Sequence, residues 1–255
     1  MRDPKHIVIT GASSGLGTAL VEAYAAQGIT LSLQGRDNIR LANVAEKAKR
    51  LGARVTTKTI DVTDAATMAS WLQSCDDTQS VDLIIANAGM SAGTDATYSS
   101  VYSSHAIFST NVTGVLNTIH PLLPNMIMRQ RGQVAIISSL AGFRGLIGTS
   151  AYCASKAAVR LYGESLRGEL KHKGIEVNVV CPGFIKTPMT DKNDFPMPFI
   201  MSATKAATII QRGLANNHAR IAFPYRLYLL VRLFATIPQD WLDPILIKLP
   251  TKKPL

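Results

Sequence analysis

Three side chains near the middle of the chain have the types and the spacing needed for proton transfer. Tyr152 and Lys156 are four residues apart, so a helix would place the phenol and the ammonium on one face. Ser139 follows the apolar run 133–137, which is typical of a buried strand, and therefore lies near a strand end.

A lysine cation lowers the pKa of a nearby tyrosine toward neutral pH, and a serine hydroxyl donates to a carbonyl oxygen on which charge develops. Ser139, Tyr152 and Lys156 would then form a general acid/base set that uses neither a metal nor a covalent nucleophile. Taken alone, the same spacing also fits a tyrosine packed against a lysine stem.

Length and composition place limits on the kind of protein. A chain of 255 residues forms one large α/β domain or two small ones, and no linker-like run divides it. The three cysteines have no metal-ligand spacing and are odd in number, which favours a reduced intracellular protein. No signal peptide or membrane-spanning run is expected. The net charge of +10 fits a soluble basic protein, an anionic ligand or a membrane surface.

The N-terminal segment has the order strand, glycine loop, helix. An apolar run at 6–9 leads into the loop 10–17, and a helical pattern follows at 18–24. Glycines let the backbone approach a pyrophosphate, and a helix N-terminus offers unpaired N–H groups. The candidate cofactor-binding residues are Thr10, Gly11, Ser13, Ser14, Gly15, Leu16 and Gly17. A plain tight turn remains the alternative.

Further strands are predicted near 29–34, 55–60, 81–86, 133–137, 175–180 and 219–223. Helices are predicted near 38–51, within 98–129, and near 152–173 and 205–215. This alternation predicts an α/β fold, in which a doubly wound parallel sheet carries helices on both faces. A ligand would then lie across the carboxyl ends of the strands.

Six motifs, in order and with the expected spacing, resemble the short-chain dehydrogenase/reductase family. They are Thr10 to Gly17, Asn87-Ala88-Gly89, Asn111, Ser139, Tyr152 with Lys156, and Pro182-Gly183. The resemblance runs from about residue 6 to about residue 223, and the interval of thirteen residues before Tyr152 selects Ser139 over Ser138. It implies a Rossmann-type catalytic domain over 1–223 with Asn111, Ser139, Tyr152 and Lys156 as its catalytic residues.

The resemblance also implies the cofactor. Arg36, just after the second strand, resembles the NADP-preferring pattern, and Arg40 could assist it. NADP(H) is therefore favoured over NAD(H), unless Asp37 holds the ribose hydroxyls instead. The remaining implied cofactor contacts are Asp61 and Val62 near the adenine, Asn87, Ala88 and Gly89 under the adenosine, Tyr152 and Lys156, and Pro182, Gly183, Ile185 and Thr187 over the nicotinamide.

The C-terminal quarter is expected to determine the substrate and the contacts of the molecule. An apolar stretch at 195–201 falls in the predicted substrate lid, about 188–203. Beyond it, 224–255 is predicted to be an apolar, basic helical extension that contacts a membrane surface or a second subunit. It resembles the extension of membrane-associated hydroxysteroid dehydrogenase-like members. No basic recognition motif for nucleic acid is present.

The sequence thus predicts an NADP(H)-dependent enzyme that interconverts a carbonyl and a secondary alcohol on a lipid-like or steroid-like substrate. Two alternatives stay open: an NAD-linked dehydrogenase of a polar alcohol or sugar, and a non-catalytic dinucleotide sensor. The expected molecule is a homo-oligomer, a dimer or tetramer, that is cytoplasmic or peripheral at the inner face of a membrane.

Overall fold

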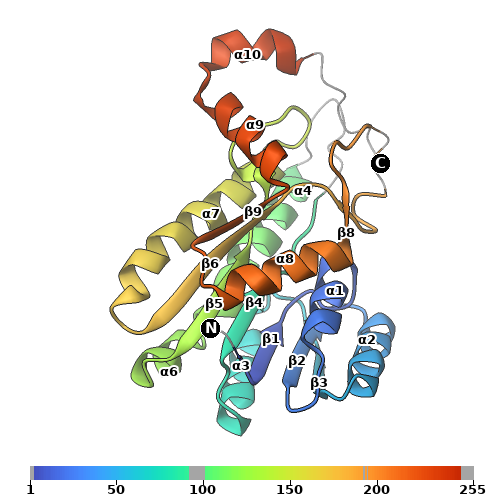
Figure 1. Ribbon diagram of the computed structural model, residues 1–255, viewed down its shortest axis with the longest axis vertical. Coiled ribbons are helices and arrows are strands. Elements are labelled where there is room, and N and C mark those ends of the chain that lie inside the picture. The colour runs from blue at the N-terminus through green and yellow to red at the C-terminus, as the bar shows by residue number, and fades with distance from the viewer. Residues whose placement is uncertain (1–2, 92–100, 192, 194, 248–255) are drawn as a thin grey trace.

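The computed structural model describes residues 3–91, 101–191, 193 and 195–247. Its centre is a seven-stranded parallel sheet in the order β3-β2-β1-β4-β5-β6-β9 (Figure 1). The strands are β1 (His6–Ile9), β2 (Thr30–Gly35), β3 (Arg54–Thr59), β4 (Leu83–Ala86), β5 (Gly132–Ile137), β6 (Ile175–Pro182) and β9 (Arg220–Phe223). The order reverses direction between β1 and β4, as in a doubly wound fold.

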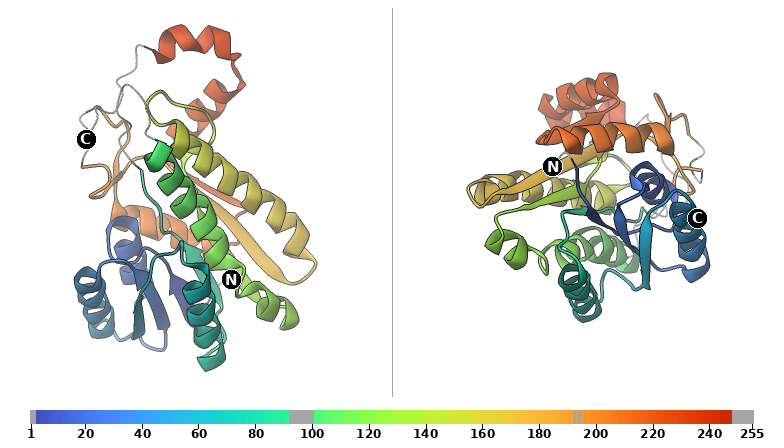
Figure 2. Two further views of the ribbon diagram at one scale, coloured as in Figure 1. Left: turned by 180° about the vertical axis from the view of Figure 1, so that it is seen from behind. Right: turned by 60° about the horizontal axis from the view of Figure 1, so that its bottom comes forward.

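Helices cover both faces of this sheet (Figure 2). On one face lie α1 (Gly15–Tyr24), α2 (Asn38–Arg50) and α8 (Ala203–Ala215). On the other lie α3 (Ala65–Thr78), α5 (Gly114–Ile119), α6 (Leu123–Met128) and α7 (Ser150–Lys171). Each layer buries its own apolar cluster against the sheet, because the central strands are apolar on both sides. The predicted α/β architecture is confirmed.

Two helices begin where carboxylates can cap them. The Asp37 side chain accepts from the backbone N–H of Arg40 at the start of α2, and Asp64 accepts from the N–H of Thr67 at the start of α3. Each carboxylate pairs a backbone donor that the helix leaves unpaired. The predicted start of α2 near residue 38 is therefore confirmed.

The stretch 98–129 is helical but not continuous over the described residues 101–129. Helix α4 (Val101–Phe108) passes through a π-helical turn, η1 (Ser109–Thr113), into α5, and a turn separates α5 from α6. Pro121 lies in that turn, and a proline lacks the N–H that a continuing helix would need.

The chain after β9 forms α9 (Tyr225–Thr236) and α10 (Gln239–Leu246), which lie beyond the carboxyl end of the sheet (Figure 1). Residues 248–255 of the predicted extension lie outside the described residues. None of the helices in the described ranges is long and apolar enough to cross a membrane.

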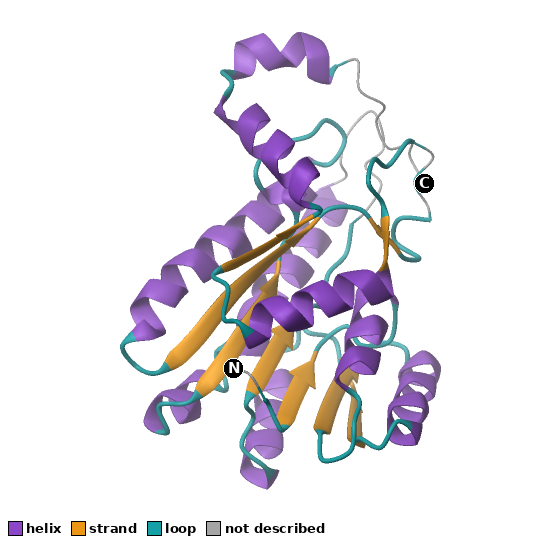
Figure 3. Ribbon diagram, viewed as in Figure 1, coloured by secondary structure: helices purple, strands orange, loops and turns teal. Residues whose placement is uncertain are grey.

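The segment predicted as a substrate lid lies at the same end of the molecule. The two-residue strand β7 (Ile185–Lys186) pairs in parallel with β8 (Met201–Ser202), so the ends of the intervening loop are joined. Figure 3 shows loops gathered where the strand arrows end, and this is where a doubly wound fold places its ligand. Positions 192 and 194 of the predicted lid lie outside the described residues.

Candidate active site

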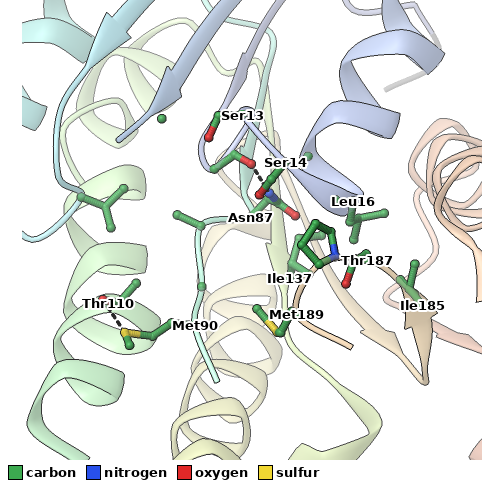
Figure 4. A pocket seen from close by; sticks show the side chains of 18 of the residues that line it. Ser13, Ser14, Leu16, Asn87, Met90, Thr110, Ile137, Ile185, Thr187 and Met189 are labelled. Carbon is green, nitrogen blue, oxygen red and sulfur yellow. Dashed lines mark hydrogen bonds between the residues drawn. The ribbon is translucent and has the colours of Figure 1, made fainter. Parts of the chain in front are cut away.

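A cleft of about 280 Å³ lies across the carboxyl ends of the strands. Most of the predicted site residues line it: Gly11, Ser13, Ser14, Gly15, Leu16, Gly17, Arg36, Asp61, Val62, Asn87, Ala88, Gly89, Ser139, Tyr152, Lys156, Pro182, Gly183, Ile185 and Thr187. Figure 4 shows side chains from the glycine loop, the strand ends and the 185–189 segment turned toward one space. Thr10 and Asn111 are fully buried and support this cleft from behind.

The glycine loop needs its glycines for two reasons. Gly11 and Gly15 have φ values of +64° and +55°, which favour glycine. A Cβ atom at Gly17 would lie 2.1 Å from the Gly11 carbonyl oxygen, so the helix start can approach the loop only without a side chain.

Thr10 and Asn87 hold this loop against the neighbouring strand end. The Thr10 hydroxyl accepts from the backbone N–H groups of Asn87 and Ala88 at 3.1 and 3.2 Å. The Asn87 amide donates to the carbonyl oxygens of Thr10 and Gly11 at 2.9 and 3.2 Å. These bonds fix the glycine loop beside the segment 87–89.

The start of α1 supplies donors suited to a phosphate group. Its N-cap residue is Ser14, and within the described part of the chain no side-chain capping bond is made there. Backbone N–H groups and the positive end of the helix dipole therefore face the cleft, which is the usual arrangement for binding a pyrophosphate. With the close glycine loop, this donor set fits a dinucleotide.

Two arginines and two aspartates lie in the part of the cleft beyond β2. Arg36 Nη1 is 3.6 Å from Asp61 Oδ2, and Arg40 Nε is 2.8 Å from Asp37 Oδ2. The Asp37 carboxylate also caps α2, and the N–H of Arg40 lowers the pKa of this carboxyl group. Both Asp37 oxygens thus already have partners on Arg40, whereas the Arg36 side chain is 65% exposed.

Ser139 and Ser138 have different roles at the end of β5. The Ser138 hydroxyl donates to the Lys156 carbonyl oxygen at 2.7 Å and so joins the strand end to α7. The Ser139 hydroxyl accepts from the Ala141 N–H at 3.1 Å and donates to the Pro182 carbonyl oxygen at 3.4 Å. Ser139 is also the hydroxyl that interacts with the Tyr152 phenol.

Tyr152 and Lys156 lie in the first two turns of α7, as their spacing predicted. Lys156 Nζ is 5.9 Å from the centroid of the Tyr152 ring and donates to the Ile137 carbonyl oxygen at 2.9 Å. Burial lowers the pKa of Lys156 to about 8, because water no longer solvates the ammonium.

The pKa of Tyr152 differs from the sequence-based expectation. Burial raises this pKa, and a hydrogen bond with Ser139 partly opposes that effect. Desolvation of the phenolate is the largest effect on this pKa, and the lowering that was expected from Lys156 is not observed.

Asn111 lies in η1 and binds the segment that follows β4. Its Oδ1 accepts from the Met90 N–H at 2.8 Å, and its Nδ2 donates to the Met90 carbonyl oxygen at 2.9 Å and to Ser155 Oγ at 3.0 Å. A Cβ atom at Gly89 would lie 3.3 Å from both Asn111 Oδ1 and Lys156 Nζ. Asn111 and Lys156 therefore flank Gly89, and their proposed water relay stays a prediction.

Several cleft residues were not named as site residues from the sequence: Gln34, Gly35, Asp37, Arg40, Met90, Thr110, Ile137, Ser138, Pro188, Met189 and Thr190. Of these, Asp37, Arg40 and Ser138 had been weighed, and 188–190 fall in the predicted lid. Gln34 accepts from the Gly11 N–H at 3.0 Å and donates to the Ile60 carbonyl oxygen. The sequence offered one indication that Gln34 belongs to the site, namely that it is a polar residue near the end of an apolar strand. Met90 and Thr110 are distant in sequence and come into contact only in the folded chain, where Thr110 Oγ1 donates to Met90 Sδ at 3.5 Å.

The fold agrees with comparisons to known proteins. A family model described as short chain dehydrogenase matches residues 5–196. An uncharacterised oxidoreductase of Myxococcus xanthus is 37% identical over 237 residues, which cover 92% of this chain and 94% of that protein. The ketoacyl reductase HetN of Nostoc sp. is 34% identical over 189 residues, covering 73% of this chain and 66% of that protein.

One solved structure extends the comparison to three dimensions. A short-chain dehydrogenase from Sphingobium yanoikuyae, in complex with NADPH, superposes with a TM-score of 0.80 and 25% identity, covering 92% of this chain and 96% of that one. The chain therefore belongs to the short-chain dehydrogenase family of oxidoreductases, as the sequence motifs had indicated.

Proposed function

We propose that this chain is an NADP(H)-dependent oxidoreductase that interconverts a carbonyl and a secondary alcohol. The observation that carries the proposal is the meeting of Ser139, Tyr152 and Lys156 in the cleft that begins at the glycine loop. A binding module would need the loop but not a phenol and an ammonium beside it. This argues against the dinucleotide sensor.

In the proposed mechanism the nicotinamide, when bound, supplies or accepts the hydride. Ser139 donates a hydrogen bond to the substrate oxygen, and Tyr152 transfers a proton to that oxygen during reduction. Lys156 holds the nicotinamide ribose and favours the phenolate that remains on Tyr152. Asn111 supports a water that returns the proton. The oxidation of an alcohol uses the same groups in reverse.

The preference for NADP(H) rests on the two arginines beyond β2. Asp37 is the carboxylate that would read the ribose hydroxyls of NAD, but its oxygens are engaged by Arg40. Arg36, whose side chain is 65% exposed and lies 3.6 Å from Asp61, would bind the additional phosphate of NADP. Similar solved structures hold NADPH in one case and NAD in another, which supports a nicotinamide dinucleotide, so the choice of NADP(H) rests on the two arginines.

A hydrophobic substrate is proposed from the side chains around the predicted lid. Met189 lines the cleft, and Phe199 and Ile200 are 48% and 42% exposed. Exposed apolar side chains on a substrate lid would suit an acyl or ring system better than a sugar. The similarity to a ketoacyl reductase is consistent with a substrate of this type.

Turnover of a carbonyl panel with NADPH and with NADH tests this function. The panel runs from small diketones to long-chain ketones and steroid ketones. We expect oxidation of NADPH, with the highest kcat/KM for an apolar ketone. Turnover with NADH alone would overturn the assignment of Arg36, and tight NADPH binding without turnover of any carbonyl would favour the sensor.

A second proposal concerns the surface of the extension. The outer side of α9 exposes Leu229, Leu230 and Leu233 at 48%, 45% and 62%, and Trp241 on α10 is 74% exposed. Arg226 and Arg232 lie on the same helix. A peripheral contact with an anionic membrane and a contact with a second subunit both suit such a face.

A further inference from the structure

Helix α9 lies against the segment that carries Ser139. Leu140, which follows Ser139, is buried in a small cluster with Val179 and Cys181, and Leu227, Tyr228 and Val231 of α9 pack on this cluster. The cluster lies at the end of β5 and β6, where the proposed reaction takes place. The inner side of α9 is thus part of the wall behind the catalytic serine.

Leu227 also contacts the loop on the other side of the cleft. A Cβ atom at Gly183 would lie 3.0 Å from Leu227 Cδ2 and 3.4 Å from Leu140 Cδ1. Gly183 belongs to the Pro182-Gly183 segment, and the Pro182 carbonyl oxygen accepts from the Ser139 hydroxyl. One side chain of α9 therefore supports both Leu140 and Gly183.

A network of ion pairs and hydrogen bonds connects α9 to α7 and β9. Glu164 on α7 binds Arg160 Nη1 through Oε1 at 3.0 Å and through Oε2 at 3.2 Å, and its Oε1 accepts from Arg220 Nη2 at 2.6 Å. Arg220 Nη1 in turn donates to the Tyr228 hydroxyl at 3.0 Å. These side chains are between 15% and 29% exposed in the ion pairs, so water screens them less than at an open surface.

Phe143 links this network to the catalytic segment. The Arg160 and Arg220 guanidinium groups lie 4.5 and 5.4 Å from the centroid of its ring, and the Tyr228 ring meets it edge-on at 5.7 Å. Arg160 Nε also donates to the Gly142 carbonyl oxygen at 3.2 Å. Glu164 thus pairs with both cations, which would otherwise repel each other more strongly around one ring.

The segment 139–143 is also pressed closely onto α7. A Cβ atom at Gly142 would lie 2.8 Å from the backbone carbon and oxygen of Lys156. We therefore expect a shift of Phe143 to move Ser139 and to change its distance from Tyr152, because Gly142 between them packs directly against the Lys156 backbone.

From these contacts we propose that Tyr228, held by Arg220 and Glu164, is a positioning residue for Ser139, so that α9 sets the geometry of the active site as well as presenting an outer surface. This inference rests on the proposed function for its kinetic readout. The plainer alternative is a network that only stabilises the fold.

Tyr228→Phe is the sharpest test, because it keeps the ring beside Phe143 and removes only the hydroxyl. Glu164→Gln is the second variant. Asp76→Asn is the matched control, since Asp76 binds Arg129 at 2.9 Å and Asn125 at 2.9 Å in a network remote from the cleft. The readouts are the melting temperature, hydrogen exchange of peptides covering 139–149, and kcat and KM with NADPH.

A positioning role predicts that Tyr228→Phe and Glu164→Gln lower kcat about fivefold or more, because small displacements of catalytic groups are costly. The KM for NADPH should stay within about twofold, and exchange in 139–149 should become faster. Asp76→Asn should lower the melting temperature without changing either kcat or exchange in 139–149.

Lower melting temperatures with unchanged kcat and unchanged exchange in 139–149 would overturn the inference. If the wild-type chain reduces no carbonyl in the panel, the exchange measurement alone decides. Faster exchange in the two variants but not in Asp76→Asn would then support positioning, and its absence would reject it, whatever the fate of the proposed function.

Discussion

At Lys156, burial opposes the positive charge that the proposed reaction uses. The ammonium donates to the Ile137 carbonyl oxygen at 2.9 Å, and its pKa is lowered from 10.5 to about 8. Such a group can hold a ribose and influence Tyr152, yet it also lowers the stability of the folded chain while it remains charged. A buried lysine that lowers the stability of the folded chain in this way is consistent with a functional role.

This pKa has a measurable effect on stability. Between pH 8 and pH 10.5 the unfolded chain binds more protons at Lys156 than the folded chain does, so stability rises with pH in that window. Relative to Lys156→Met, the wild-type free energy of unfolding should increase by about 3 kcal/mol from pH 8 to pH 10.5. Urea unfolding across this range measures the difference.

Lys171→Met provides the matched control, because Lys171 lies at the exposed end of the same helix. It shows the effect of replacing an exposed lysine of the helix by methionine. A difference from wild type that stays constant with pH for Lys156→Met would mean that Lys156 titrates alike in both states, against this account.

Among the elements, α7 contributes most to the site, because it supplies Tyr152 and Lys156. The helix must also lie close to the sheet. Gly163 permits that approach: a Cβ atom there would lie 2.6 Å from Val179 Cγ2 and 2.9 Å from Ile136 Cδ1. At Gly168, on the exposed side of the same helix, an added Cβ atom would meet nothing within 4 Å among the described residues.

The two glycines therefore predict opposite results for the same substitution. Gly163→Ala should destabilise the chain by about 1–3 kcal/mol through overpacking. Gly168→Ala should stabilise it by about 1 kcal/mol, because alanine favours the helix. Chemical unfolding of both variants measures these changes. A stabilised Gly163→Ala would show that α7 has room to move away from the sheet.

The elements themselves were largely predictable from the sequence. Apolar runs such as 133–137 and 175–180 were recognisable as strands because a parallel sheet buries both of their faces. Breaks in helices were harder, and the π-helical turn around Asn111 gave no local signal. Its geometry depends on bonds to Met90, which is 21 residues away.

For the site, the continuous motifs proved to line one cleft, whereas distant contacts gave no signal in the sequence. The glycine loop and the pair Tyr152 and Lys156 were recognised from their order among the other motifs, because the spacing of each alone also fits a tight turn or a packed tyrosine. The partners of Glu164 were not, since Arg220 lies 56 residues further along the chain. The raised pKa of Tyr152 also depends on burial, which spacing cannot indicate.

At the scale of the whole molecule, the two sides of α9 have separate proposed roles. The inner side packs on the catalytic segment, and the outer side exposes leucines to solvent. Leu230→Ser with Leu233→Ser alters only the outer side. The double variant should reduce either cosedimentation with anionic vesicles or self-association in analytical ultracentrifugation.

Leu161→Ser is the control for this experiment, because Leu161 is a 56% exposed leucine on α7 and is not part of the extension. Loss of vesicle binding alone would assign the outer side of α9 to a membrane, and loss of self-association alone would assign it to a subunit contact. If both behaviours match wild type, the proposed contact is wrong.

The central claim is that the Tyr152 phenol transfers the proton in a reaction that oxidises NADPH. The most direct measurement is a single turnover of NADPH against the best ketone of the panel, for wild type, Tyr152→Phe and Tyr162→Phe. Tyr162 lies on the same helix, but its hydroxyl pairs with His120 Nε2 at 2.8 Å. We expect a loss of about 100-fold or more in Tyr152→Phe, in the range of general acid catalysis, and wild-type rates in Tyr162→Phe. Equal rates in wild type and Tyr152→Phe would contradict the mechanism proposed for this cleft.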